Sequence, residues 1–243
     1  MVIITNTITT MNKTIIITFL MLSPLLASAD KVEINGIWYN LNAETKTAEV
    51  TSNASNSTTT YNLRYVDIPS QVNYNEVSYQ VTAIGENAFR NTVLEYIGIP
   101  SSVTSIGSDA FMDCSKLYKV SIEDITAWRK IQFANSSANP LCYGNRLYLN
   151  GVEVTHVTFP NTMTSIQPWV FIGCANLTSV TIPTSVTKIG QGAFFNSGLT
   201  SVEIPSSVTT IGESAFQYCK KMTSVNIPNT LTSIEPNTFS TCI

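Results

Sequence analysis

Charged residues are scarce in this chain. Lysine, arginine, aspartate and glutamate make up 12% of its 243 residues, about half of the usual quarter. The formal net charge of −3 leaves no basic stripe to neutralise phosphates, so we expect no nucleic-acid partner. Serine, threonine and asparagine fill the polar positions instead, and the sequence predicts a weakly charged surface rich in hydroxyl groups.

The residues on which most enzymes depend are scarce as well. His156 is the single histidine, and no cysteine or serine nucleophile stands in a recognisable motif with it. The sequence has no C-x-x-C, no H-E-x-x-H, no calcium loop and no glycine-rich phosphate loop. We therefore predict no enzyme activity, no catalytic residues, no metal site and no cofactor.

Residues 1–29 differ from the rest of the chain. Lys13 precedes an apolar segment, and Ala27-Ser28-Ala29 forms an A-x-A cleavage site, which is the order of a secretory signal peptide. The apolar segment of roughly 12 residues is too short for a span of about 20, so we expect cleavage after Ala29 and no remaining transmembrane segment. The predicted location is secreted or cell-surface. Met1 and Met11 are both possible starts.

Internal repetition is the strongest feature of the sequence. An isoleucine is followed at the fifth position after it by a phenylalanine six times, and these phenylalanines are Phe89, Phe111, Phe171, Phe194, Phe216 and Phe239. Most of them are separated by a step of about 23 residues, which indicates a solenoid. The step from Phe111 to Phe171 is longer. Because 60 equals 23 plus 37, we expect one enlarged coil of 37 residues, at 122–159.

The apolar residues of each coil also align. Leu177, Val180 and Ile182 form an L-x-x-V-x-I segment that recurs in later coils, and its period of two predicts a strand with Ser179 and Thr181 facing outward. One coil cannot bury its own apolar face, so the coils must stack. The predicted fold is a leucine-rich-repeat solenoid, a curved right-handed rod with parallel β-strands on its concave face and coils of about 23 residues.

The repeat divides the chain into regions. We expect an N-terminal β cap of two hairpins at 30–82 and a repeat domain at 83–243 that stops inside a coil, which we interpret as truncation. Within the enlarged coil we expect a short helix over 125–131. We also expect a hairpin whose type I′ turn is Asn150-Gly151, and we predict that this segment protrudes from the rod.

The segments from Ile182 to Val202 and from Ile204 to Val225 closely resemble the BspA-like leucine-rich-repeat family of bacterial surface proteins. The resemblance covers about residue 61 to the end. It implies a secreted or cell-surface binding module that adheres to host matrix or cell-surface proteins, or to other bacterial surface components. A structural segment of a larger surface protein, without a ligand of its own, is the alternative.

Outward strand positions are the candidate binding residues because they line the predicted concave face. One column holds Tyr96, Lys119, His156, Ser179, Ser201 and Ser224, and the second holds Gly98, Ser121, Thr158, Thr181, Glu203 and Asn226. In the enlarged coil, aromatic and arginine side chains are candidate anchors, since these residue types dominate binding hot spots. They are Trp128, Arg129 and Tyr148.

Five cysteines remain. Cys114, Cys174, Cys219 and Cys242 share one column, and Cys142 lies in the enlarged coil. We favour buried thiols, because free cysteine is among the most buried residues. A bridge between Cys219 and Cys242, on adjacent coils of an exported protein, stays open.

Overall fold

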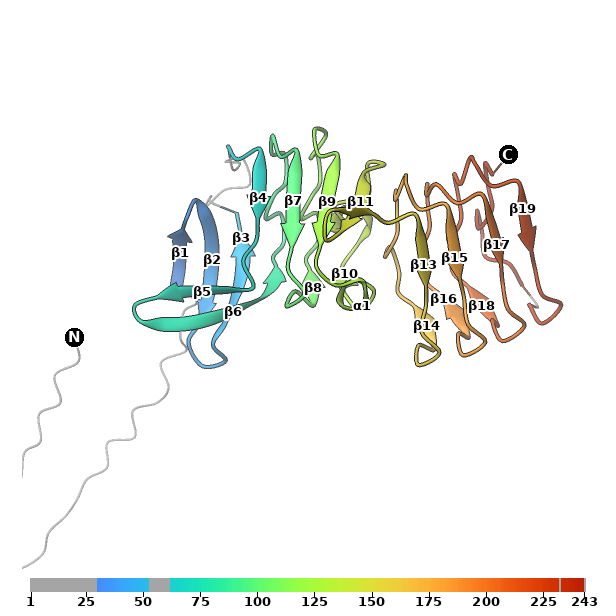
Figure 1. Cartoon of the computed structure of the whole chain (residues 1–243), viewed down its shortest axis with the longest axis horizontal. Coiled ribbons are helices and arrows are strands. Elements are labelled where there is room, and N and C mark those ends of the chain that lie inside the picture. The colour runs from blue at the N-terminus through green and yellow to red at the C-terminus, as the bar shows by residue number, and fades with distance from the viewer. Residues whose placement is uncertain (1–29, 53–61, 232, 243) are drawn as a thin grey trace, which may run out of the picture.

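The computed structural model describes residues 30–52, 62–231 and 233–242 and shows a row of stacked β-coils (Figure 1). The predicted signal peptide, at 1–29, lies outside the described residues. The predicted repeat solenoid is confirmed, because successive coils pair strand on strand in parallel.

The N-terminal end is built from hairpins. β1 (Asp30–Ile34), β2 (Ile37–Asn42) and β3 (Thr47–Thr51) form an antiparallel meander. β5 (Gln71–Tyr74) and β6 (Val77–Ile84) form a second hairpin, whose turn residues Asn75 and Glu76 have φ of 48° and 65°. The two hairpins predicted here are confirmed. β3 also pairs in parallel with β6, which joins the meander to the coils.

A first row of parallel strands follows the length of the solenoid, and we call its solvent side the ladder face. Its strands are β4 (Tyr65–Asp67), β7 (Tyr96–Ile99), β9 (Lys119–Ile122), β11 (Arg146–Leu149), β13 (His156–Thr158), β15 (Ser179–Thr181), β17 (Ser201–Glu203) and β19 (Ser224–Asn226). β4 lies within the range 30–82 that we expected to form the cap, yet it pairs with β7 in the ladder.

A second row of short strands closes the coils on the other side of the core. It comprises the end of β6 with β8 (Ser105–Ile106) and β10 (Gln132–Phe133), and then β14 (Ser165–Ile166), β16 (Lys188–Ile189) and β18 (Thr210–Ile211). Their isoleucines belong to the repeated Ile and Phe pattern and are buried.

The repeated phenylalanines stack along the interior, as Phe194 shows with its ring centroid 5.9 Å from that of Phe171 and 5.3 Å from that of Phe216. Each phenylalanine sits between two residues of left-handed backbone, two positions before and two positions after it, as at Gly192 (φ 57°) and Asn196 (φ 52°). Glycine and asparagine tolerate this conformation best. These two turns bring the chain around each ring.

The enlarged coil resolves into two parts. β11 pairs with β9 in the register Arg146 to Lys119, so the first part is a complete coil, somewhat longer than the regular ones. The second part, from Arg146 to His156, folds into the hairpin of β11 with β12 (Val152–Glu153). The predicted turn is confirmed, because Asn150 and Gly151 have φ of 49° and 83°.

The helix predicted over 125–131 is present only as the single turn α1 (Ile125–Trp128), and a 3-10 turn, η1 (Ser136–Ala138), follows it. Asp124 caps α1 by accepting a hydrogen bond from the Thr126 N–H at 2.6 Å. The enlarged coil was predicted to protrude from the rod, and for its first part, which holds α1 and β10, this is wrong. β10 continues the second row, and Trp128 is 1% exposed, with its indole N–H donating to the Val170 carbonyl at 3.0 Å.

Candidate binding surface

Strand register sets the outward columns of the ladder face. Tyr96 pairs with Lys119, His156 with Ser179, and Ser201 with Ser224, as the first predicted column requires. The second column likewise aligns Gly98 with Ser121, Thr158 with Thr181, and Glu203 with Asn226. The neighbouring strands extend the columns with residues that sequence reasoning missed or placed elsewhere: Tyr65 and Arg146 in the first, and Asp67 and Tyr148 in the second.

The two halves of the ladder face differ in chemistry. Over β4 to β11 most outward side chains are aromatic or charged, Gly98 and Ser121 being the exceptions, and we call Tyr65, Tyr96, Lys119 and Tyr148 the tyrosine cluster. Over β13 to β19 most outward side chains are serine or threonine. Tyr65 is 61% exposed, which is unusual for so large a ring.

Lys119 holds the centre of the tyrosine cluster. Its Nζ lies 5.5 Å from the centroid of the Tyr96 ring and 4.7 Å from that of the Tyr148 ring. Each such cation–π contact is worth about 0.5–1 kcal/mol at an exposed site. The ammonium therefore orders two rings on strands that flank its own.

Carboxylates fix the phenol ends of the same rings. Tyr96 donates to Asp67 Oδ1 at 2.6 Å, Tyr65 donates to Glu95 Oε2 at 3.0 Å, and Tyr148 donates to Glu153 Oε1 at 2.9 Å. The hydrogen bond to Glu95 raises the pKa of Tyr65, and the one to Glu153 raises the pKa of Tyr148. These phenols stay protonated near neutral pH and continue to donate.

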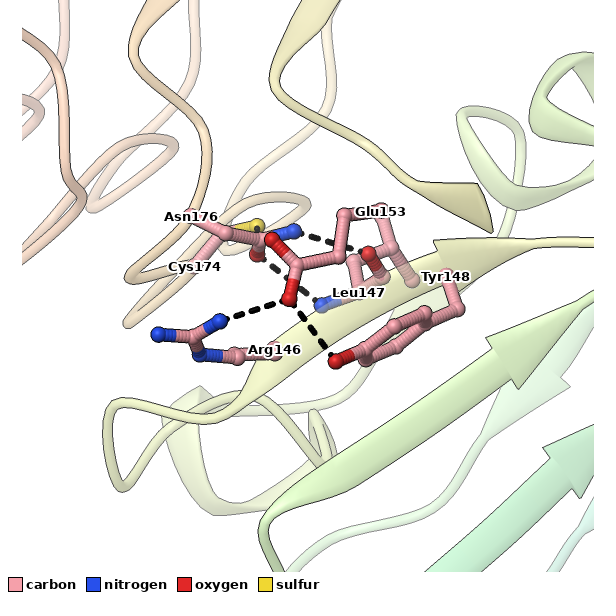
Figure 2. A network of polar contacts seen from close by, with 6 residues as sticks. All are labelled: Arg146, Leu147, Tyr148, Glu153, Cys174 and Asn176. Atoms are coloured by element: carbon pink, nitrogen blue, oxygen red, sulfur yellow. Dashed lines mark hydrogen bonds and ion pairs between the residues drawn. The ribbon is translucent and has the colours of Figure 1, made fainter. Parts of the chain in front are cut away.

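Two arginines complete the carboxylate network. Arg64 forms an ion pair with Glu95, and its hydrogen bond is the largest cause lowering the pKa of that carboxyl. Arg146 Nη1 lies 2.6 Å from Glu153 Oε1 (Figure 2). The pKa of Glu153 is lowered most by the hydrogen bond from Tyr148 and next by the one from Arg146. Both glutamates therefore remain ionised well into the acid range and keep the rings in place.

β15 and β17 lie in separate sheets, and so do β11 and β13, where the ladder is interrupted beside the β11–β12 hairpin. Asn176 bridges this break: its Oδ1 accepts from the Leu147 N–H at 3.0 Å, and its Nδ2 donates to the Leu147 carbonyl at 2.9 Å (Figure 2). One side-chain amide thus replaces the neighbouring strand. The break leaves a cleft of about 260 Å³, the hairpin cleft, between the β11–β12 hairpin and β13.

The hairpin cleft is lined by residues of α1, the hairpin and β13. They are Ile125, Arg129, Leu149, Val152, Glu153, Val154, Thr155, His156, Val157 and Thr158. Trp128 and Arg129 were predicted as candidate anchors, and the structure shows that both are buried. Trp128 is 1% and Arg129 6% exposed, because α1 packs inward against the coil that carries Phe159.

His156 lies at the start of the hydroxyl-rich half. Its Nδ1 is 2.7 Å from Ser179 Oγ, and its Nε2 is 3.0 Å from Thr158 Oγ1. The predicted column already placed Ser179 on the strand next to this histidine, and the register confirms it. In a serine hydrolase the second ring nitrogen meets a carboxylate, whereas here it meets a hydroxyl, so the pair lacks the group that orients a catalytic base.

The prediction of buried thiols holds for three of the four cysteines in the column, whereas Cys242, like Cys142, is only partly buried. All five are free thiols, and Cys114, Cys174 and Cys219 are buried. The Cys219 thiol donates to the Phe194 carbonyl of the preceding coil at 3.1 Å, and Cys242 donates to the Phe216 carbonyl at 3.0 Å. In this structure Cys219 and Cys242 are not bridged.

The described residues contain neither a metal-binding cluster nor a membrane-spanning helix. Across 30–52, 62–231 and 233–242, no three histidine, cysteine or carboxylate side chains gather in a way that would hold a metal ion. Over that same part of the chain, no helix combines the length and hydropathy needed to cross a bilayer.

Known proteins share this repeat. A family model for the BspA type leucine rich repeat region matches residues 70–145 and 143–243, in six copies. A crystal structure of a leucine rich cell surface protein from Faecalibacterium prausnitzii A2-165 is 29% identical, with a TM-score of 0.55, and the match covers 81% of this chain and 54% of that one. A leucine-rich repeat protein from Bacteroides ovatus ATCC 8483 is 28% identical, with a TM-score of 0.47, over 87% of this chain and 45% of that one.

The chain therefore spans about half the length of these two solved proteins. No curated protein matches it.

Proposed function

The chain belongs to the BspA-type leucine-rich repeat family, and from that premise we propose that it is an exported binding module whose tyrosine cluster contacts a protein partner. The partner class is a host matrix or cell-surface protein, or another bacterial surface component. The solved Faecalibacterium relative is described as a cell surface protein, and residues 1–29 have the sequence of a signal peptide, which together support secretion or surface display.

The observation that carries the proposal is the ordering of outward-facing tyrosines on one half of the ladder face, where Tyr65 is exposed and Tyr96 and Tyr148 are partly exposed. The fold does not need Tyr65 there, since its ring is 61% exposed and the inward residues of the strand make the core. Tyrosine supplies a large contact area with few rotatable bonds, and rings already held by Lys119 and carboxylates lose little freedom on binding. Such rings are typical binding hot spots.

The charges around the cluster favour a partner of mixed polarity over a highly charged one. Lys119, Arg64 and Arg146 are matched by Asp67, Glu95 and Glu153. The surface therefore has no excess charge of one sign to steer a polyanion or polycation.

Surface plasmon resonance with the folded protein tests this function. Matrix proteins and bacterial cells form the panel, and we expect at least one to bind with micromolar affinity or better. A Tyr65→Ala, Tyr96→Ala double variant should weaken that binding by about tenfold or more, because each hot-spot residue contributes on the order of 1 kcal/mol or more.

A matched control is available on the same face. Ser201→Ala, Ser224→Ala changes the same column in the hydroxyl-rich half and should leave binding unchanged, while thermal unfolding verifies that both variants are folded. Equal losses in the two variants, or no micromolar binding by any member of the panel, would contradict the proposal. The absence of micromolar binding would favour a structural role, which the serine and threonine side chains of β13 to β19 also support.

Export has its own measurement. The full chain expressed in a secreting bacterium should appear outside the cytoplasm with Asp30 as its first residue. N-terminal sequencing that finds Met1 or Met11 retained on the exported protein would contradict cleavage after Ala29.

A further inference from the structure

Arg129 is buried without a counter-ion. The residue is 6% exposed, and neither ion pair found among the described residues involves it, whereas Arg64 and Arg146, both exposed, each have a glutamate. Asp124 is the carboxylate that attracts it, but Asp124 caps α1 and forms no ion pair with the guanidinium within the described chain. A buried charge normally has a partner, because leaving it unpaired is costly.

The hydrogen bonds of Arg129 leave donors unused. Nη1 donates to the Thr158 carbonyl, and Nη2 donates to Thr126 Oγ1 at 3.3 Å. A guanidinium carries five N–H groups, so several have no acceptor within the described chain. The Phe159 ring, 5.7 Å from Cζ, packs against the guanidinium without accepting a conventional hydrogen bond.

The same guanidinium lines the hairpin cleft. The other lining side chains are mainly aliphatic, with Ile125, Leu149, Val154 and Val157 among them. About 260 Å³ is near the lower end of ligand pockets, enough for one aliphatic side chain and a small polar group. The cleft thus combines one guanidinium group with a mainly aliphatic lining.

Charge selects the kind of anion. Arg129 is the one permanently charged cation of the lining, and Glu153 contributes a carboxylate to the same wall, already bound to Arg146 and Tyr148. A doubly charged phosphate would meet one cation and one repelling anion. A singly charged, planar carboxylate fits the fork of one guanidinium and leaves its apolar substituent for the aliphatic wall.

We propose that the hairpin cleft binds the C-terminal residue of a peptide, with its α-carboxylate on Arg129 and an aliphatic side chain against Ile125, Leu149 and Val157. None of the four residues of the tyrosine cluster lines this cleft, although Glu153 of its wall also binds Tyr148, and the proposal does not depend on whether that cluster binds a protein. The carboxylate supplies the acceptors that the buried guanidinium lacks, and the aliphatic side chain covers the apolar wall.

The test compares a ligand that carries a carboxylate with its uncharged amide analogue. The full chain is titrated with N-acetyl-leucine and with N-acetyl-leucinamide, and the Nε–H signal of Arg129 is followed by NMR, assigned from its absence in Arg129→Lys. We expect the acid to shift this signal with millimolar affinity and the amide to bind at least tenfold more weakly. Equal binding of acid and amide, or binding by neither, overturns the proposal.

Two further ligands distinguish the source of the anion. Octanoate presents a carboxylate without a peptide group, and inorganic phosphate presents charge without an apolar part. N-acetyl-leucine should bind at least fivefold more tightly than either. A preference for octanoate would assign the cleft to fatty acids, and a preference for phosphate would assign it to a free anion, and each result overturns the proposal.

Variants on the exposed hairpin keep the test informative even if changing Arg129 unfolds the protein. Val152 is 72% exposed and lines the cleft, so Val152→Glu should weaken binding of the acid and Val152→Lys should strengthen it, each about twofold, with the amide unaffected. Lys188→Ala, at an exposed position of β16 outside the cleft, is the control and should leave binding of the acid unchanged. Affinity for the acid that does not respond to the sign of the charge at Val152 would contradict the proposal.

Discussion

Replacing Asn176 with alanine should destabilise the protein at the break in its ladder. The Asn176 side chain is buried, with an exposed fraction of 8%, and it makes both hydrogen bonds that a neighbouring strand would otherwise give to Leu147. In Asn176→Ala the Leu147 N–H loses its partner in a fully buried position. The Leu147 carbonyl keeps a second donor, the Val154 N–H at 2.9 Å.

The magnitude follows from these two groups. An orphaned buried N–H costs about 1–3 kcal/mol, and loss of one of two hydrogen bonds at the carbonyl costs about 0.5–1.5 kcal/mol, so the free energy of unfolding should fall by about 3 kcal/mol. For a chain of this size, each kcal/mol lowers the melting temperature by about 2–4 °C, so the expected shift is about 9 °C.

Urea denaturation followed by tryptophan fluorescence measures the loss. Trp128 reports on the region, since its indole N–H bonds to Val170. Hydrogen exchange of the peptide that contains Leu147 should also become faster. Asn226→Ala, at an exposed ladder position, is the control and should change stability by less than about 0.5 kcal/mol. An equally small change in Asn176→Ala, with unaltered exchange at Leu147, would refute the reasoning.

Two other changes test the packing and the thiols. Gly192→Ala should strongly destabilise the protein, because the added Cβ would lie 1.9 Å from the Trp169 ring and φ of Gly192 is 57°. Gly151→Ala is the comparison: φ is 83°, nothing lies within 4 Å of the added Cβ, and the change should cost only about 1–2 kcal/mol of backbone strain. Thermal melts measure both variants, and equal losses of stability would contradict this account. Burial raises the pKa of Cys142 and Cys174 to about 12, so the unfolded thiols ionise first and the free energy of unfolding should fall as pH rises above about 8.5. Urea titrations between pH 7 and 10 measure how steeply the free energy of unfolding falls with pH. The slope should be smaller in Cys142→Ser, and an unchanged slope would show that ionisation of the thiols does not cause the fall.

Repetition made the coils predictable from sequence. The same apolar positions recur in every regular coil, so inward positions such as Val202 and outward positions such as Ser201 could be assigned from several coils at once. Arg146 escaped this reasoning because Gly144 stands where the opening leucine of its coil would be, whereas Tyr65 was missed although Leu63, Val66 and Ile68 complete the pattern around it. Their neighbours Val66 and Leu147 nevertheless occupy inward ladder positions, which was the remaining signal.

The sequence by itself determined the repeating coil, its strands and the outward columns, because those depend on residues close together in the chain and on a period that many coils share. Only the tertiary structure decided how the irregular segment packs. A single helical turn has no period that tells which side faces inward, and Arg129 is buried by contact with Thr158, 29 residues away. Asn176 likewise meets Leu147 across 29 residues. Each of these contacts occurs once in the chain, so no repeated sequence pattern predicts them.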